Sequence, residues 1–195
     1  MRGTDEVEAY GEVGATLEAA CVSVVPTTDV AAVAALWGVD LDAPMEAPED
    51  GPPYETDVLT WQVWFVPVDG HVVVVEDNGY RGNDADLAAA ASRLGGGGRV
   101  AVAYWNIEAV VTVLCAESGE VLVGPDEVRV GLDAPAAAAD VDDLLAPFRR
   151  LVEEGDLGPS WVGTALAVAA RWTGVPITED LLDMEGRAVY LVAEE

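Results

Sequence analysis

Short apolar stretches separated by turn residues run through the first two thirds of the chain. This pattern is typical of strands, because strands of four to eight residues between turn signals bury their apolar side chains in a sheet. The predicted strands are residues 21–25, 59–68, 71–76, 99–105, 110–116 and 120–123. Asp69-Gly70 predicts a hairpin turn between the second and third of them, and Pro67 indicates an edge position or a bulge beside that turn.

Other stretches carry apolar residues at helical spacing. The predicted helices are residues 5–20, 29–37, 84–94, 141–152 and 160–174, with a short one opening at Thr178. Gly11 and Gly14 predict that the first of these is frayed or broken, and Pro147 predicts a kink or restart in the fourth. Residues 188–192 form a further apolar stretch that predicts a closing strand.

The first six elements of the sheet region follow the order strand, helix, strand, strand, helix, strand. This is the split βαβ order of ferredoxin-like folds, in which two helices pack on one face of an antiparallel sheet. We therefore predict an α+β fold with ferredoxin-like βαββαβ order, an extra hairpin and C-terminal helices. The chain predicts one domain, with a helical segment at 1–19, a sheet core at 20–125 and a helical part at 133–195.

Two tryptophans indicate how this sheet is covered. Trp61 and Trp64 lie three residues apart in one predicted strand, so alternation sends their side chains to opposite faces. We expect the helices to cover one of them and the C-terminal segment to cover the other, so that both faces of the sheet are packed. An exposed, ligand-binding aromatic residue is the alternative.

The charge balance changes the picture of function. The chain has 195 residues and 36 acidic side chains against nine basic ones, all of them arginine, for a net charge of −27. Such a charge repels phosphate backbones and anionic membrane surfaces, which disfavours direct nucleic-acid and membrane binding. It attracts a basic protein, a cationic ligand or divalent ions. Acidity for solubility, or for life at raised salt, is the alternative explanation.

The residue types that most often carry catalysis are scarce. His71 is the single histidine and follows a hairpin turn, where a half-buried or solvated structural role is expected. Cys21 and Cys115 lie in apolar strands, which predicts buried free thiols. The glycine run at 95–98 follows a helix, whereas a phosphate-binding loop precedes one. No catalytic residue, metal ligand or cofactor is predicted. The start of the chain resembles no signal peptide, and a cytoplasmic protein is expected.

The negative charge is densest in residues 39–57, where acidic residues alternate with prolines. No lysine or arginine lies between Arg2 and Arg81, and the prolines predict an extended, exposed loop. The candidate partner-binding residues in this loop are Asp40, Asp42, Glu46, Glu49, Asp50, Tyr54, Glu55 and Asp57.

Five short motifs make the chain resemble a known family. They are Glu76-Asp77-Asn78-Gly79-Tyr80-Arg81-Gly82, Tyr104-Trp105-Asn106, Ala116-Glu117-Ser118-Gly119, Gly163-Thr164-Ala165-Leu166 and Thr173-Gly174-Val175-Pro176-Ile177-Thr178. The chain resembles, from residue 21 to residue 183, a family of uncharacterised actinobacterial proteins of about this size. The resemblance implies a high-GC genome and a single domain, and it carries no activity and no site with it.

We therefore predict a non-enzymatic acidic protein that binds a basic protein partner, acting as an inhibitor in the manner of immunity proteins or nucleic-acid mimics. One alternative is a domain that binds a small molecule or a divalent cation, as ferredoxin-like sheets often do. Another is a hydrolase that uses two carboxylates in one cleft. Its candidate acid pairs are Asp40 and Asp42, Asp142 and Asp143, Glu153 and Glu154, and Asp180 and Asp183.

Overall fold

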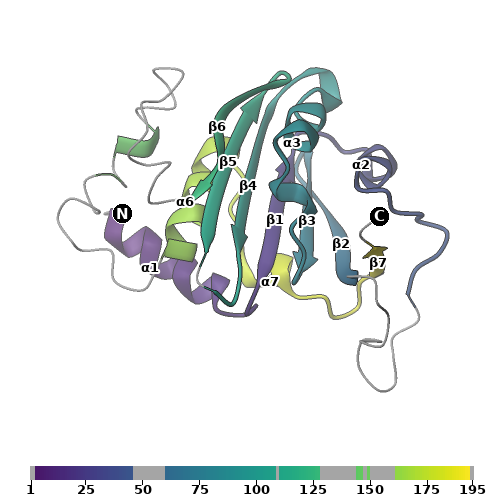
Figure 1. Ribbon diagram of the computed structural model, residues 1–195, viewed down its shortest axis with the longest axis horizontal. Coiled ribbons are helices and arrows are strands. Elements are labelled where there is room, and N and C mark those ends of the chain that lie inside the picture. The colour runs from purple at the N-terminus through teal and green to yellow at the C-terminus, as the bar shows by residue number, and fades with distance from the viewer. Residues whose placement is uncertain are drawn as a thin grey trace.

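The computed structural model describes residues 3–45, 60–108, 110–127, 144–146, 149 and 161–193. It confirms the α+β class and an antiparallel sheet with an extra hairpin (Figure 1). The strands are β1 (Ala20–Val25), β2 (Thr60–Val68), β3 (His71–Asp77), β4 (Arg99–Trp105), β5 (Val111–Glu117), β6 (Glu120–Glu127) and β7 (Tyr190–Ala193). The helices are α1 (Gly3–Gly14), α2 (Val30–Trp37), α3 (Ala85–Ala91), α6 (Trp161–Thr173) and α7 (Glu179–Leu182), with 3₁₀ turns η1 (Arg81–Asn83) and η2 (Leu94–Gly96).

The strand order differs from the predicted one. The sheet has seven strands in the order β6-β5-β4-β1-β3-β2-β7, and every neighbouring pair is antiparallel. The hairpin of β5 and β6 extends the sheet beyond β4, and β7 returns from the C-terminal part to extend it beyond β2. The ferredoxin-like order is therefore not confirmed for this sheet. Short strands and turn signals do not encode how far a sheet continues past a predicted unit.

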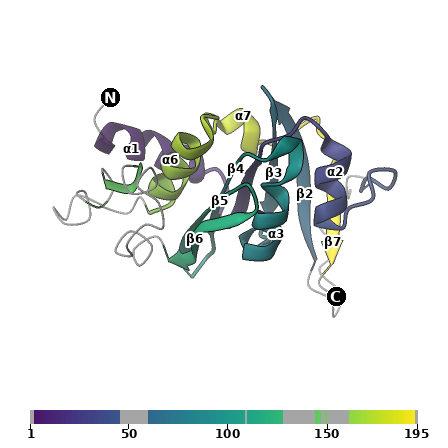
Figure 2. The ribbon, with the colours of Figure 1, turned by 90° about the horizontal axis from the view of Figure 1, so that it is seen from above.

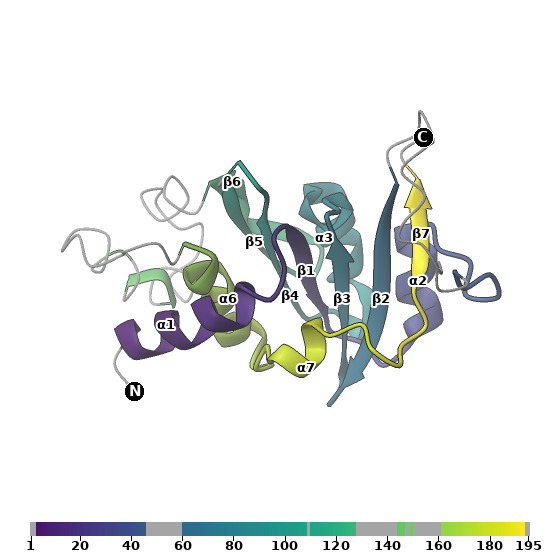
Figure 3. The same ribbon diagram turned by 90° about the horizontal axis from the view of Figure 1, so that it is seen from below.

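Helices cover both faces of the sheet. Figure 3 shows α1, α6 and α7 in front of it and α2 and α3 behind it, and Figure 2 gives the same arrangement from above. The two faces bury separate apolar cores, one under each helix layer. The prediction for the two tryptophans is confirmed, since Trp61 lies in the core under α2 and α3 and Trp64 in the core under α1, α6 and α7.

Local sequence signals explain the boundaries of α2. The Asp29 side chain accepts a hydrogen bond from the backbone N–H of Ala32 at 3.0 Å, as an N-cap does. Gly38 ends the helix with a φ of 70°, a conformation that glycine adopts without steric cost. The expectation for Pro67 also fits, because β7 pairs only with residues 60–63 of β2 and Pro67 lies beyond that stretch.

The first helix differs from the prediction in length and regularity. It runs without a break from Gly3 to Gly14, where a frayed helix over residues 5–20 was expected. The last glycine serves packing, since a Cβ on Gly14 would lie 2.4 Å from Cγ1 of Val162 in α6. Contact with α6 stabilises a helix that glycine weakens in isolation.

The C-terminal predictions are partly covered. α6, α7 and β7 lie where two helices and a closing strand were expected. Most of the predicted helix at 141–152 lies outside the described residues. The part of it that is described, residues 144–146 and 149, is helical. Of the helices in the described part of the chain, none combines the length and the apolar character needed to cross a membrane.

Candidate functional site

A groove runs between α1 and the segment that carries α7. It consists of two adjoining cavities, of about 410 Å³ and about 470 Å³, which share the exposed side chains of Glu179 and Asp180. We call the two cavities together the acidic groove. Its size falls in the range of ligand-binding clefts in proteins, roughly 300–1,000 Å³.

The cavity beside β3 combines an apolar floor with several carboxylates. The apolar lining residues are Leu17, Trp64, Leu182 and Met184. The acidic lining residues are Asp77, Glu179, Asp180 and Asp183. The Trp64 indole donates its N–H to the carbonyl oxygen of Leu181 at 3.3 Å, so its polar atom is satisfied within the fold and its buried ring lies beneath the cavity.

Asp77 is the least exposed of these acidic residues. It is the last residue of β3, and its side chain is half-buried on the α1, α6 and α7 face. Burial raises the pKa of Asp77 above its ordinary value, and no nearby donor or cation lowers it. Within the described residues its carboxylate has no ion pair and no hydrogen-bond donor. Such a carboxylate gains stability when a cation enters the cavity.

The second cavity lies against α1. Tyr10 and Val13 of α1 face Ile177 of the segment before α7, and Glu12 adds another carboxylate. Burial is the main cause that raises the pKa of Tyr10, and the negative charge of Glu6 acts in the same direction. An ion pair between Glu6 and Arg171 joins α1 to α6 and fixes this wall of the groove.

Besides Arg171, a second arginine lies close to the acidic groove. The Arg187 guanidinium donates to the backbone carbonyl oxygens of Asp183, at 2.6 Å, and Asp180. Arg187 thus binds the main chain of the α7 segment rather than its carboxylates. The carboxylate of Asp183 accepts one bond, from the backbone N–H of Glu185 at 2.9 Å. The segment is held in place while its acidic side chains stay available to a ligand.

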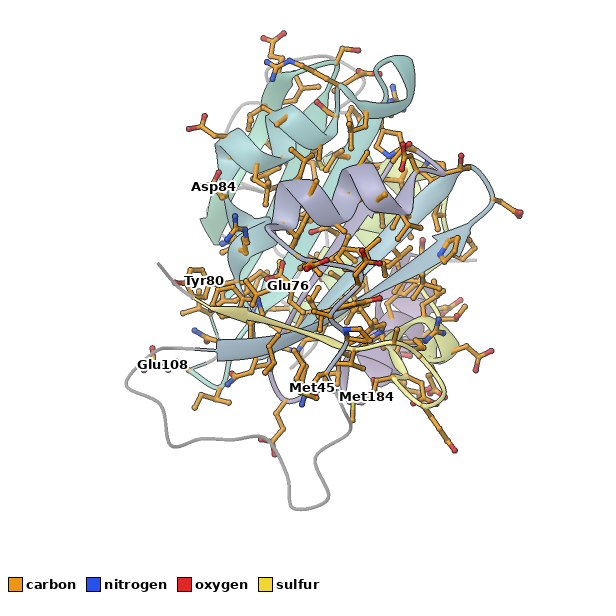
Figure 4. All side chains as sticks on the ribbon, turned by 90° about the vertical axis from the view of Figure 1, so that its right-hand side faces the viewer. Met45, Glu76, Tyr80, Asp84, Glu108 and Met184 are labelled. Atoms are coloured by element: carbon orange, nitrogen blue, oxygen red, sulfur yellow. The ribbon has the colours of Figure 1, made fainter. Side chains whose placement is uncertain are left out.

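A second polar cluster is buried on the opposite face of the sheet. The side chain of Glu76 is fully buried in β3, among the apolar residues under α2 and α3 (Figure 4). Its Oε1 accepts hydrogen bonds from the Trp37 indole at 3.0 Å and the backbone N–H of Gly82 at 2.7 Å. Its Oε2 accepts one from the backbone N–H of Arg81 at 2.9 Å. Three donors therefore compensate the burial of this carboxylate in part.

The carboxyl groups of Glu76 and Asp77 make the stability of the fold depend on pH. Burial raises the pKa of Glu76 above 4.5, opposed by its hydrogen bonds, and burial alone raises that of Asp77. Each group therefore binds a proton more tightly in the folded protein, and the resulting stability is lost as pH rises through the raised values. Repulsion within the net charge of −27 acts in the same direction. We expect the melting temperature to fall as pH rises above the ordinary pKa values of the two groups, 3.8 for Asp77 and 4.5 for Glu76.

Thermal unfolding followed by circular dichroism across this range measures the effect. Added salt separates its two sources, because salt screens the surface repulsion and leaves the buried part unscreened. A melting temperature that rises with pH at low and high salt would contradict the direction of both pKa shifts.

The structure brings together few of the predicted site residues. Asp40 and Asp42 are exposed in a turn after α2, where the Asp40 carboxylate accepts a hydrogen bond from the backbone N–H of Asp42 at 3.0 Å. The neighbouring Val39 and Leu41 pack on the α2 and α3 face, so this turn lies on the other face of the sheet from the acidic groove. The remaining predicted residues lie outside the described part of the chain: Glu46, Glu49, Asp50, Tyr54, Glu55 and Asp57.

The predictions for cysteine and histidine are confirmed. Cys21 and Cys115 are both buried and form no disulfide. Burial raises the pKa of Cys115 to about 12, so its thiol is protonated at neutral pH. His71 is half-buried at the start of β3, with Nδ1 3.1 Å from the carbonyl oxygen of Asp69.

The sequence does not predict the acidic groove, although the candidate acid pair of Asp180 and Asp183 lines it. Its walls come from segments that are more than 150 residues apart along the chain, and no local pattern joins them. The described residues contain no group of three or more His, Cys, Asp or Glu side chains placed to hold a metal ion.

Comparisons with known proteins give no relative from which a role for either cluster can be transferred. No protein-family model matches the chain, and neither the curated proteins nor the solved structures contain a significant match. The resemblance to the actinobacterial family stays a prediction. The function of the acidic groove therefore has to be inferred from its own geometry and charge.

Proposed function

We propose that this protein binds a basic protein partner and that the acidic groove receives basic side chains of that partner. The observation that carries the proposal is Asp77, a half-buried carboxylate in a cavity, without a cation or donor among the described residues. A guanidinium or ammonium group placed there would form a charge-assisted hydrogen bond in a partly desolvated site. Such bonds are stronger than neutral ones.

The lining of the groove suits an arginine or lysine side chain in particular. Both residues have an aliphatic stem and a charged end, and they bury the stem on apolar surface. The half-buried Leu17 and the exposed Met184 provide that surface, while the carboxylates lie around it. Arginine fits best, because its planar guanidinium binds carboxylates in pairs of parallel hydrogen bonds.

The charge of the whole protein supports the same proposal at longer range. A net charge of −27 attracts a basic partner before contact and raises the rate of association at low salt. Local contacts in the groove would then select among basic partners. Within this proposal, inhibition of the partner, as by immunity proteins or nucleic-acid mimics, remains the specific form that the acidity suggests.

A titration with an arginine-rich peptide tests this binding. Neutralising Glu179, Asp180 and Asp183 together (E179Q, D180N, D183N) is expected to weaken binding at least about tenfold, because the groove loses most of its negative charge. Asparagine at position 183 keeps the oxygen that accepts the bond from Glu185. Isothermal titration calorimetry at fixed salt measures the dissociation constants.

A charge-matched control separates the groove from general attraction. Asp69, Asp86 and Glu108 are exposed and line neither cavity, so D69N, D86N and E108Q remove the same charge elsewhere. The control is expected to bind within about threefold of the parent protein. Equal losses in the two triple variants would show that only net charge matters and would overturn the groove as the site.

The groove also favours a second candidate, the binding of a small organic cation. Its cavity beside β3 has a suitable volume. A carboxylate-dependent hydrolase is the other alternative, because burial raises the pKa of Asp77 in a cavity that holds further carboxylates. We also propose that β4-β1-β3-β2 with α2 and α3 form a ferredoxin-like unit within the sheet, a fold that often hosts ligands. A thermal-shift screen with polyamines and amino-acid derivatives tests this candidate, and shifts lost in the groove variant would favour it.

A further inference from the structure

The buried cluster around Glu76 lies beneath a short segment, residues 78–83, which includes η1. Glu76 in β3, Cys21 and Ser23 in β1 and Trp61 in β2 all lie on this face of the sheet and are buried. The segment closes over them with glycine backbone. A Cβ on Gly82 would lie 2.3 Å from Oγ of Ser23 and 3.0 Å from Sγ of Cys21. The thiol and the hydroxyl are thus covered by one thin stretch of main chain.

The segment is anchored at both ends and held in the middle by Glu76. At one end the backbone N–H of Asn78 donates to the carbonyl oxygen of Ala19 at 2.9 Å. At the other end the Thr112 hydroxyl donates to Oδ1 of Asn83 at 2.8 Å. Between these anchors, the two backbone bonds to Glu76 join the segment to the sheet.

Two side chains of the segment add weaker contacts. The ring of Tyr80, which is 38% exposed, lies over Trp61 with 5.2 Å between the ring centroids. The Arg81 guanidinium lies against Gly38 at the end of α2. Both contacts are at or near the surface, so water replaces them at low cost.

Closure leaves polar atoms with weak compensation. Oγ of Ser23 and Nε1 of Trp61 are buried and make no hydrogen bond of good geometry with the described residues, although the Cys21 thiol and the Glu76 carboxylate are their polar neighbours. Burial also disfavours the charged form of Glu76 by raising its pKa. All three groups regain water when the segment lifts, which offsets the hydrogen bonds that opening breaks.

We infer that residues 78–83 form a flap latched by Glu76, which opens locally, without global unfolding, and exposes Cys21. The inference is independent of the proposed function, since the flap and the acidic groove lie on opposite faces of the sheet. Local openings of this kind have lower free energies than global unfolding, because they expose only a part of the core.

The two buried cysteines provide the test. Cys21 lies under the flap, whereas Cys115 lies in the other core, under α1, α6 and α7. The native protein is exposed to iodoacetamide for increasing times and then digested with trypsin. Cleavage at Arg81, Arg99 and Arg129 places the two cysteines in different peptides, so mass spectrometry gives both rates in one sample.

We expect Cys21 to react at least about tenfold faster than Cys115, after each rate is normalised to that of the unfolded chain. The Cys21 rate is expected to change little at low urea concentrations, because local opening exposes little surface, while the Cys115 rate rises. E76Q is expected to raise the Cys21 rate further. Its amide nitrogen would replace one of the two oxygens that accept a backbone N–H of the flap, so the flap would lose a hydrogen bond.

Equal rates with the same urea dependence at both cysteines would overturn the inference, because they would show that Cys21 reacts only through global unfolding. If E76Q does not fold, the test still holds, because the rates of Cys21 and Cys115 are compared within the wild-type protein.

Discussion

Replacing Glu76 with alanine is expected to lower the free energy of unfolding by about 3–5 kcal/mol, the largest effect of any single substitution proposed. The change leaves three donors without an acceptor, namely the buried Trp37 indole and Gly82 backbone N–H and the half-buried backbone N–H of Arg81. It also leaves a void in a packed core. Urea unfolding followed by tryptophan fluorescence measures the loss.

Two further variants test whether the lost hydrogen bonds cause the loss of stability. E76Q keeps one acceptor oxygen and the shape of the side chain, so its loss is expected to be about 1–3 kcal/mol. E108A removes an exposed carboxylate and is expected to stay within about 0.5 kcal/mol of the parent. If the free energy of unfolding of E76A lies within about 1 kcal/mol of that of the parent, the hydrogen bonds to Glu76 do not stabilise this region.

Replacing Gly82 with alanine is expected to cost about 3 kcal/mol. The new methyl group would lie 2.3 Å from Oγ of Ser23 and 2.9 Å from Oε1 of Glu76, and both atoms belong to the central strands of the sheet. The segment has to move away to accommodate the methyl group, which breaks the hydrogen bond from Gly82 to Glu76. Equilibrium unfolding in urea again gives the change.

A second substitution checks that steric contact is the cause. S23A removes the closest atom, so G82A combined with S23A is expected to be more stable than the sum of the two single effects predicts. G70A serves as a comparison, because it adds a methyl group in open space at a φ of 81° and carries only the cost of that backbone conformation. Additive effects of G82A and S23A would contradict the proposed contact.

The predicted elements were largely right because they depend on local signals. Asp29 and Gly38 mark the limits of α2, and Asp69-Gly70 marks the hairpin between β2 and β3. Alternation within a strand also placed Trp61 and Trp64 in different cores. These features require only neighbouring residues, and the sequence states them directly.

The strand order and the acidic groove could not be predicted, because both depend on contacts between distant segments. β7 pairs with β2 across more than a hundred residues, and α7 meets α1 over a still longer separation. Glu76 carried a signal that could have been used. It continues the phase of Val72 and Val74 on a buried strand face, where a charge requires dedicated hydrogen-bond donors.

The central claim is that the acidic groove recognises a basic protein. Immobilised parent protein, the groove variant E179Q/D180N/D183N and the control D69N/D86N/E108Q are exposed to lysate of the native host, and captured proteins are quantified by mass spectrometry. A fourth variant neutralises the five loop residues Asp40, Asp42, Glu46, Glu49 and Asp50. The proposal predicts a basic protein that is captured by the parent and the control and lost with the groove variant. A basic protein captured equally by parent, control and groove variant, or lost only with the loop variant, would contradict it.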